Sequence, residues 1–216
     1  MRHSCRMFHS LNAQMADRYS SFEELSEAET EGRDFAVRCA NRGSRVLVLA
    51  PHGGGIEPGT SELAISISGP ELSYYVFDGL KPQGNGELHI TSTNFDEPKA
   101  LELAAASEFV LSVHGEGSDE EVVYMGGLDN LLKPQVKRAL YEAGFATGEK
   151  PGIMAHDPSN ICNRCTSGAG LQLELTRGLR ARFFQSLSAS GRRNTTDDFE
   201  LFCEAVRVGI QNAGAF

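Results

Sequence analysis

The sequence predicts an α/β domain built on a mixed, largely parallel sheet. Three observations support this fold class. Strand-like and helix-like segments alternate along the chain, which favours parallel strands joined by helices. Arg45–Ala50 and Phe109–Val113 are short, continuous apolar runs, as expected for strands that are buried on both faces. The 216 residues are 40% apolar and 23% charged, an ordinary globular composition for one folded domain.

Capping and turn signals define the elements of the N-terminal half. Ser21 and Glu24 have the spacing of a capping box, so a short acidic helix is expected to begin there. A glycine-rich loop is expected at Pro51–Gly59, followed by a short helix near Ser61–Ser68. Strands are expected at Asp34–Cys39, Arg45–Ala50, Leu72–Asp78 and Glu87–Ser92.

The C-terminal half continues the alternation. Asp96-Glu97-Pro98 is a helix-start signal, because proline is favoured in the first turn, and this helix is expected to run to about Ser107. A second helix is expected over Asp129–Ala143, ending at Gly144. The remaining expected elements are strands at Phe109–Val113 and Leu171–Leu175 and a terminal amphipathic helix at Asp197–Gln211.

Charge and hydropathy exclude two classes of partner. Twenty basic residues against 29 acidic ones give a net charge of −9, which argues against a nucleic-acid-binding surface. No apolar run approaches the roughly 20 residues of a membrane span. Five cysteines cannot all pair within the chain, so a reduced protein is expected.

The first 14 residues, MRHSCRMFHSLNAQ, are polar and lack the apolar core of a signal peptide. We expect residues 1–14 to be a disordered or non-native extension and residues 15–216 to form one domain. A cytoplasmic protein is expected, with release by a phage or prophage as a further possibility.

Two of the buried strands end in histidine followed by glycine. His52 follows the run RVLVLA and His114 follows FVLSV, while Glu57 lies five residues after His52. The carboxyl ends of parallel strands form the ligand crevice of an open α/β sheet, so these side chains are candidates for one site. Two histidines, one carboxylate and a water form the pattern of catalytic zinc. The competing interpretation is that both histidines are hydrogen-bonded strand ends and that the glycine-rich loop is a tight turn.

A catalytic zinc site also needs a carboxylate that is not a ligand, to move protons between water and leaving group. Glu174 lies in LQLEL, where it alternates with apolar residues. A carboxylate in such a pattern either faces solvent or points into an active site.

The segment CNRC supports two interpretations. Cys162 and Cys165 form a C-x2-C pair, but no second pair or suitably spaced histidines follow, so we expect neither to bind metal. Asn163 and Arg164 form a polar pair suited to binding a carboxylate through the planar guanidinium. His156 nearby is expected to be a surface residue.

Four segments together, PHGGGIEPGTSELA, LSVHG, NICNRC and LQLELTRGLR, resemble the phage-type poly-γ-glutamate hydrolases. These are zinc-dependent enzymes related to the carboxypeptidase fold and often described as phage-related replication proteins. The resemblance extends from about Tyr19 to Arg182, and PHGGxIExGT is its specific part. It implies a three-layer α/β/α fold like that of zinc carboxypeptidases. It also implies cleavage of γ-glutamyl amide bonds in poly-γ-glutamate, an anionic bacterial polymer.

The resemblance further implies a role for each candidate residue. One Zn²⁺ would be bound by His52, Glu57 and His114, Glu174 would be the catalytic carboxylate, and Asn163 and Arg164 would bind a substrate carboxylate. Common carboxypeptidases have two residues between the first histidine and the glutamate, whereas this chain has four.

A polyanionic substrate would require a local positive groove, for which Arg164, Arg177 and Arg180 are candidates. Two alternatives stay open. One is a zinc deacylase or carboxypeptidase for another small acyl-amino acid or peptide. The other is a non-catalytic phage or prophage protein that retains the fold.

Overall fold

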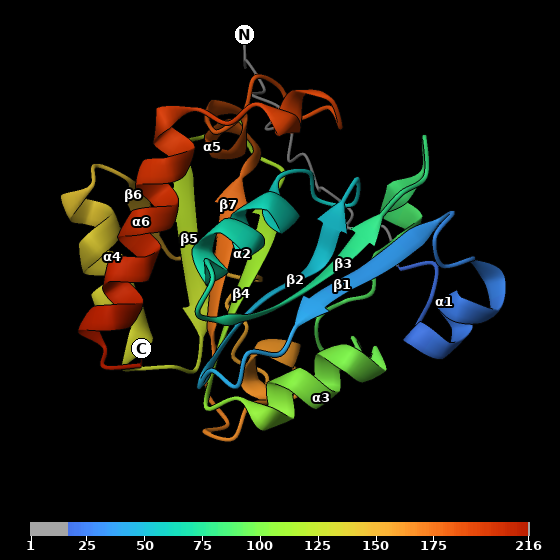
Figure 1. Cartoon of the computed structure of the whole chain (residues 1–216), viewed down its shortest axis with the longest axis horizontal. Helices are drawn as coiled ribbons and strands as arrows, with labels where there is room; N and C mark the ends of the chain where they lie inside the picture. The colour runs from blue at the N-terminus through green and yellow to red at the C-terminus, as the bar shows by residue number, and fades with distance from the viewer. Residues whose placement is uncertain (1–16, 216) are drawn as a thin grey trace, which may run out of the picture.

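The computed structural model describes residues 17–215, so the expected extension at residues 1–14 lies outside the described residues. The described chain is organised by a seven-stranded sheet in the order β1-β3-β2-β4-β7-β5-β6 (Figure 1). Neighbouring strands are parallel except for β1 with β3 and β5 with β7, which confirms the predicted mixed, largely parallel sheet. The strands are β1 (Phe35–Ala40), β2 (Val46–Gly54), β3 (Ser73–Gly79), β4 (Phe109–Glu116), β5 (Val122–Gly127), β6 (Ala146–Gly148) and β7 (Leu171–Thr176).

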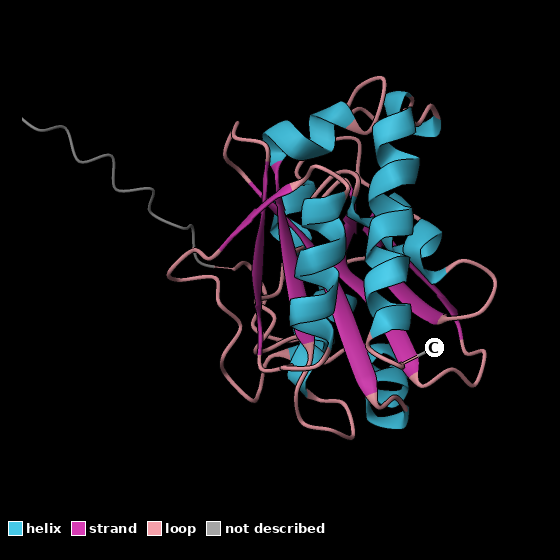
Figure 2. Cartoon of the chain, turned by 90° about the vertical axis from the view of Figure 1, so that its left-hand side faces the viewer, coloured by secondary structure: helices cyan, strands magenta, loops and turns pink. Residues whose placement is uncertain are grey.

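Helices cover both faces of this sheet and give the expected α/β/α layers (Figures 1 and 2). A hydrophobic core lies on each face of the sheet, and the alternating side chains of β2 contribute to both. Val46, Val48 and Ala50 pack with α2 (Thr60–Ser68), α4 (Leu132–Glu142) and α6 (Asp197–Asn212). Leu47 and Leu49 point the opposite way, toward α1 (Phe22–Ala28) and α3 (Pro98–Ala106). Within residues 17–215, no helix combines the length and apolar character needed to cross a bilayer.

The capping signals that define α1 and α3 have the expected geometry. The Ser21 side chain accepts a hydrogen bond from the Glu24 amide at the start of α1. The Glu97 carboxylate accepts one from the Ala100 amide at the start of α3, where Pro98 occupies the first turn. Each signal therefore fixes where its helix begins.

Two strands extend beyond their expected ends, and both extensions concern the site. Strand β2 continues to Gly54 and β4 to Glu116, so His52 and His114 lie within strands rather than in loops. The register of β2 against β3 shifts between Ala50 and Gly53, which marks a bulge beside His52. The parallel strands β2, β4 and β7 end at one edge of the sheet, where the predicted site residues gather.

The predicted strand at Glu87–Ser92 is wrong. Asn85–Leu88 forms a 3-10 turn, and the chain after it is irregular. Leu88 and Ile90 are both fully buried. The segment therefore needs apolar residues at alternating positions, although it forms no strand. Its backbone polar groups bond within turns, to side chains or to a distant loop: the His89 amide donates to the Gly86 carbonyl, the Thr91 amide donates to Asp17, and the Ile90 carbonyl accepts from His52.

Two strands and one α-helix were not predicted, β5, β6 and α5 (Arg177–Arg182), and neither were the short 3-10 helices at Ile161–Asn163 and Gly191–Arg193. The predicted helix at Asp129–Ala143 begins later, at Leu132. The Asp129 carboxylate accepts hydrogen bonds from the Leu131 and Leu132 amides, so Asp129 caps the turn before the helix.

Candidate metal centre and active-site cleft

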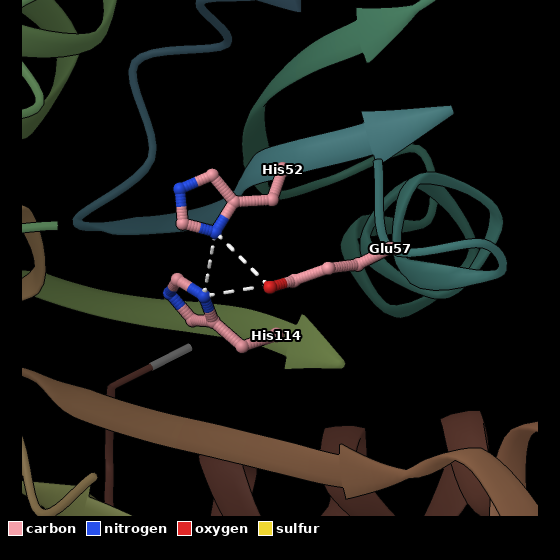
Figure 3. Close-up of side chains that lie close together, drawn as sticks. All are labelled: His52, Glu57 and His114. Atoms are coloured by element: carbon pink, nitrogen blue, oxygen red, sulfur yellow. Dashed lines mark hydrogen bonds and ion pairs between the residues drawn. The ribbon is translucent and has the colours of Figure 1, made fainter. Parts of the chain in front are cut away.

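Three side chains from separate positions converge at the carboxyl edge of the sheet. His52 lies in β2, His114 lies in β4, and Glu57 lies in the turn between β2 and α2 (Figure 3). The two Nδ1 atoms are 3.2 Å apart, and Glu57 places Oε1 3.3 Å from Nδ1 of His52 and Oε2 3.7 Å from Nδ1 of His114. Among the described residues, this is the cluster able to hold a metal ion.

Neighbouring backbone groups orient two of the three donors. Nε2 of His52 lies 2.8 Å from the Ile90 carbonyl oxygen, which can only accept, so this nitrogen carries a proton and Nδ1 faces the cluster. The Gly115 amide donates to Oε2 of Glu57 at 2.8 Å. Outer hydrogen bonds of this kind orient metal ligands in known sites.

The donor spacing fits a small tetrahedral cation. Ligands that lie about 2.0–2.1 Å from a tetrahedral zinc are separated from one another by about 3.3–3.4 Å. The two Nδ1 atoms are 3.2 Å apart, close to this value, each Nδ1 lies within 3.7 Å of one Glu57 oxygen, and one donor atom from each of the three residues lies within 4.8 Å of the others. Two imidazole lone pairs facing one another beside a carboxylate repel unless a proton or a cation lies between them, and the donor set is the one that zinc prefers.

The charge states of the three groups are strongly linked. Burial lowers the pKa of His52, but the charge and hydrogen bond of Glu57, together with the Ile90 carbonyl and the Asp17 charge, raise it overall. Burial would raise the pKa of Glu57, yet the two histidines lower it to about 2. Burial lowers the pKa of His114 to about 3. Without a metal, Glu57 thus stabilises a proton on Nδ1 of His52, the nitrogen that faces the cluster. Metal binding must displace this proton.

His89 belongs to the site although no sequence pattern indicated it. Its ring lies on that of His52, with centroids 3.9 Å apart, and its Nδ1 lies 2.6 Å from the Asp17 carboxylate. Burial, followed by the nearby His52, lowers the pKa of His89. The misassigned strand at Glu87–Ser92 concealed this residue, and no spacing in the sequence connects it to Asp17.

Glu174 lies on β7 directly beside His114, because the two residues are register partners in the parallel pair β4–β7. Its side chain is buried. Burial, followed by the charges of Glu57 and Glu116, raises the pKa of Glu174 well above its usual range. The solvent-facing alternative for Glu174 is therefore wrong, and the side chain borders the same cleft as the cluster.

The cleft at this site is a cavity of about 840 Å³. Its lining includes His52, Glu57, His114 and Glu174. His156, expected at the surface, is exposed and also lines the cavity. A cleft of this size accommodates a drug-sized ligand or a few residues of a polymer.

Lys150 is the one lysine or arginine among the described residues that line this cavity. Its Nζ lies 2.9 Å from Glu116 Oε1 and 5.2 Å from the centre of the Tyr124 ring. The Glu116 carboxylate also accepts hydrogen bonds from the amide and hydroxyl of Ser118. A cation inside the cleft was not predicted, because Lys150 carries no motif.

The three arginines considered for a positive groove do not line the cavity. Arg180 is buried, and it donates to the carbonyls of Pro58, Leu175 and Glu116 at 2.7, 3.1 and 3.0 Å. It thereby joins the Glu57 turn to the ends of β7 and β4. Arg177 pairs with Asp119 at the surface.

Asn163 and Arg164 do not line the cavity themselves, but both contact loops that do. The Asn163 amide donates to the Ala155 and Asp157 carbonyls, both at 2.9 Å, and accepts from the Gly170 amide. Arg164 donates to the carbonyls of Ser159 and Thr93. Both residues hold loops that border the cavity, and their contact with substrate stays a prediction.

The cysteines of the C-x2-C pair, Cys162 and Cys165, are buried free thiols. Neither belongs to the metal-capable cluster of the described chain. Burial raises the pKa of Cys162 to about 12, so its thiolate is strongly disfavoured. The cysteines therefore serve here as small core residues.

Comparison with known proteins fixes the family. The family model for poly-gamma-glutamate hydrolase matches residues 19–205, which is most of the chain. The chain belongs to the poly-γ-glutamate hydrolase family. The resemblance inferred from PHGGGIEPGTSELA and the other segments is thus confirmed.

Individual proteins and solved structures are similar to this chain over about nine-tenths of its length. YoqZ, a UPF0714 protein derived from the SPbeta prophage of Bacillus subtilis (strain 168), is 39% identical over 196 residues, covering 89% of this chain and 70% of YoqZ. A solved bacteriophage poly-γ-glutamate hydrolase matches with a TM-score of 0.88 at 36% identity, covering 91% of this chain and 97% of that one. The zinc-free apo structure of YndL matches with a TM-score of 0.86 at 39% identity, covering 91% and 98%.

Proposed function

We propose that the protein is a zinc-dependent amidohydrolase that cleaves the γ-glutamyl amide bonds of poly-γ-glutamate. The observation that carries the proposal is the convergence of His52, Glu57 and His114 beside the buried Glu174. This convergence occurs in a chain of the poly-γ-glutamate hydrolase family. A relative whose apo structure is described as zinc-free supports zinc as the metal.

His52, Glu57 and His114 would hold the ion. When bound, zinc supplies a Lewis acid and lowers the pKa of a bound water toward about 7. The Ile90 carbonyl keeps Nδ1 of His52 directed at the site, and the Gly115 amide keeps the Glu57 carboxylate turned toward both histidines.

Glu174 would transfer the proton. Its carboxylate takes a proton from the attacking water, and the carboxyl then gives it to the nitrogen of the leaving γ-glutamyl amide. Burial and the charges of Glu57 and Glu116 favour the neutral carboxyl of Glu174 in the metal-free site, whereas the positive charge of a bound Zn²⁺ would favour the carboxylate that accepts the water proton.

Each residue of the polymer carries a free α-carboxylate, which the enzyme must bind. Lys150 supplies a positive charge inside the cleft. We propose that Arg164, between the Thr93 and Ser159 carbonyls, binds another such carboxylate at the cleft margin, with Asn163 holding the adjoining loop.

The test compares γ-linked with α-linked polyglutamate of equal length, with release of new amino ends as the readout. Both polymers carry one carboxylate per residue, so net charge cannot explain a difference between them. We expect cleavage of the γ-linked chain and at least about 100-fold slower cleavage of the α-linked chain, since the scissile amide would be misplaced. Equal cleavage of both, or activity only on short acyl-amino acids, would reject the polymer assignment.

A further inference from the structure

Gln172 lies two residues before Glu174 on β7, so both side chains project from the same face of the sheet. Both are buried and both line the cleft. Nε2 of Gln172 lies 2.8 Å from Oε1 of Glu174. A neutral amide therefore contacts the carboxyl to which we assign proton transfer.

The direction of this hydrogen bond is fixed by a chain of partners that starts at the backbone. The Cys162 amide can only donate, and it lies 3.0 Å from Oδ1 of Asn160. Asn160 must then present its NH₂ group to Oε1 of Gln172, at 3.2 Å. Nε2 of Gln172 consequently faces Glu174, and the same NH₂ lies 3.3 Å from the Ile153 carbonyl, which can only accept.

We propose that Gln172, itself held by Asn160, is a positioning residue that keeps Oε1 of Glu174 a hydrogen-bond acceptor and reserves Oε2 for proton transfer. This inference rests on the proposed function of Glu174. In a protonated carboxyl the hydroxyl oxygen is a weaker hydrogen-bond acceptor than the carbonyl oxygen, so an amide that donates to Oε1 favours the proton on Oε2. The acceptor role of Oε1 thus selects one oxygen and one carboxyl orientation for the reaction.

The kinetic test replaces Gln172 with leucine, which has a similar size but cannot donate. We expect Gln172→Leu to lower kcat on poly-γ-glutamate by about 10-fold or more, the scale of one hydrogen bond to a charged group, with KM and zinc content unchanged. Gln172→Met provides a second, unbranched replacement in case leucine disturbs folding. Gln185→Leu is the matched control, because Gln185 is exposed and bonds to Asn194 away from the cleft.

A double-mutant cycle separates positioning from general structural damage. In the Glu174→Gln background, Gln172→Leu should cause no further loss of kcat, since the side chain at position 174 can no longer transfer a proton and its orientation no longer matters for that step. An unchanged kcat in Gln172→Leu, or an equal fractional loss in both backgrounds, would overturn the inference.

A second readout does not depend on substrate. The infrared carbonyl stretch of protonated Glu174, identified by its disappearance in Glu174→Gln, should shift to higher frequency in Gln172→Leu, because Oε1 loses its donor. An unshifted band would overturn the inference even if the polymer is cleaved. A shifted band in a protein that does not cleave the polymer would support the inference about Gln172 while rejecting the proposed substrate.

Discussion

Glu174 is the residue whose environment departs furthest from an ordinary surface carboxylate. Burial and the nearby Glu57 and Glu116 favour its neutral form, and Gln172 donates to one of its oxygens. Such a group is costly to maintain for stability alone, whereas general acid–base catalysis uses this combination. Glu57 differs from Glu174 in this respect. The two neighbouring histidines lower the pKa of Glu57 to about 2 and keep it ionised, as a metal ligand must be.

Replacing Glu174 with glutamine should separate catalysis from metal binding. Glutamine keeps the shape and can still accept from Gln172, but it cannot take a proton from water. We expect kcat/KM on poly-γ-glutamate to fall by about 100-fold or more, with zinc content unchanged. Glu142→Gln is the matched control, since Glu142 pairs with Arg138 on the exposed surface of α4. Parallel loss of zinc and activity would instead make Glu174 a ligand or a structural residue.

At the level of elements, the end of β2 positions His52 through glycine. A Cβ on Gly53 would overlap the Ser61 hydroxyl and lie 2.9 Å from the Phe77 carbonyl oxygen. Strand β2 can therefore approach β3 and α2 this closely only with glycine at this position. Packing thus constrains Gly53, which follows the predicted ligand His52 directly, and a shift of the backbone at Gly53 would also displace His52.

Gly53→Ala should consequently damage both the fold and the metal site. We expect the free energy of unfolding to fall by about 1–3 kcal/mol, the usual cost of an added methylene in a packed core, and zinc affinity to weaken with it. The measurements are chemical denaturation and zinc titration. Gly86→Ala serves as the control, because a Cβ there meets no atom within 4 Å. A Gly53→Ala protein with unchanged stability and zinc affinity would contradict this role for the β2 bulge.

The sequence predicted those elements whose signal is local. Buried apolar runs gave the central strands, and the Ser21 and Pro98 signals gave the starts of α1 and α3. The strand predicted at Glu87–Ser92 failed because burial alone produced its alternation. Short edge elements such as β6 carry too few residues for a periodic pattern.

The residues of the candidate site also differ in whether a local sequence signal indicates them. His52 and His114 were accessible to sequence reasoning because each follows a buried run that ends at the same sheet edge. Gln172 could have been found from its two-residue spacing to Glu174. His89 and Lys150 reach the cleft from irregular segments, and only tertiary packing places them there.

At the scale of the whole molecule, charge constrains how substrate is bound. A net charge of −9 repels a polyanion at long range. Among the described residues, Lys150 is the lysine or arginine that lines the cleft, alongside several carboxylates. The two positive charges of a bound zinc ion would therefore be the largest local attraction for substrate carboxylates.

The most direct test of this account is a titration of zinc into chelator-treated protein, with bound metal and cleavage of poly-γ-glutamate measured on the same samples. We predict activity that rises in proportion to bound zinc and saturates at about one equivalent, the stoichiometry of a mononuclear catalytic site. His114→Ala should bind zinc far more weakly and stay inactive at one equivalent. Full cleavage activity in wild-type protein without bound metal, or full zinc binding and activity in His114→Ala, would contradict the account.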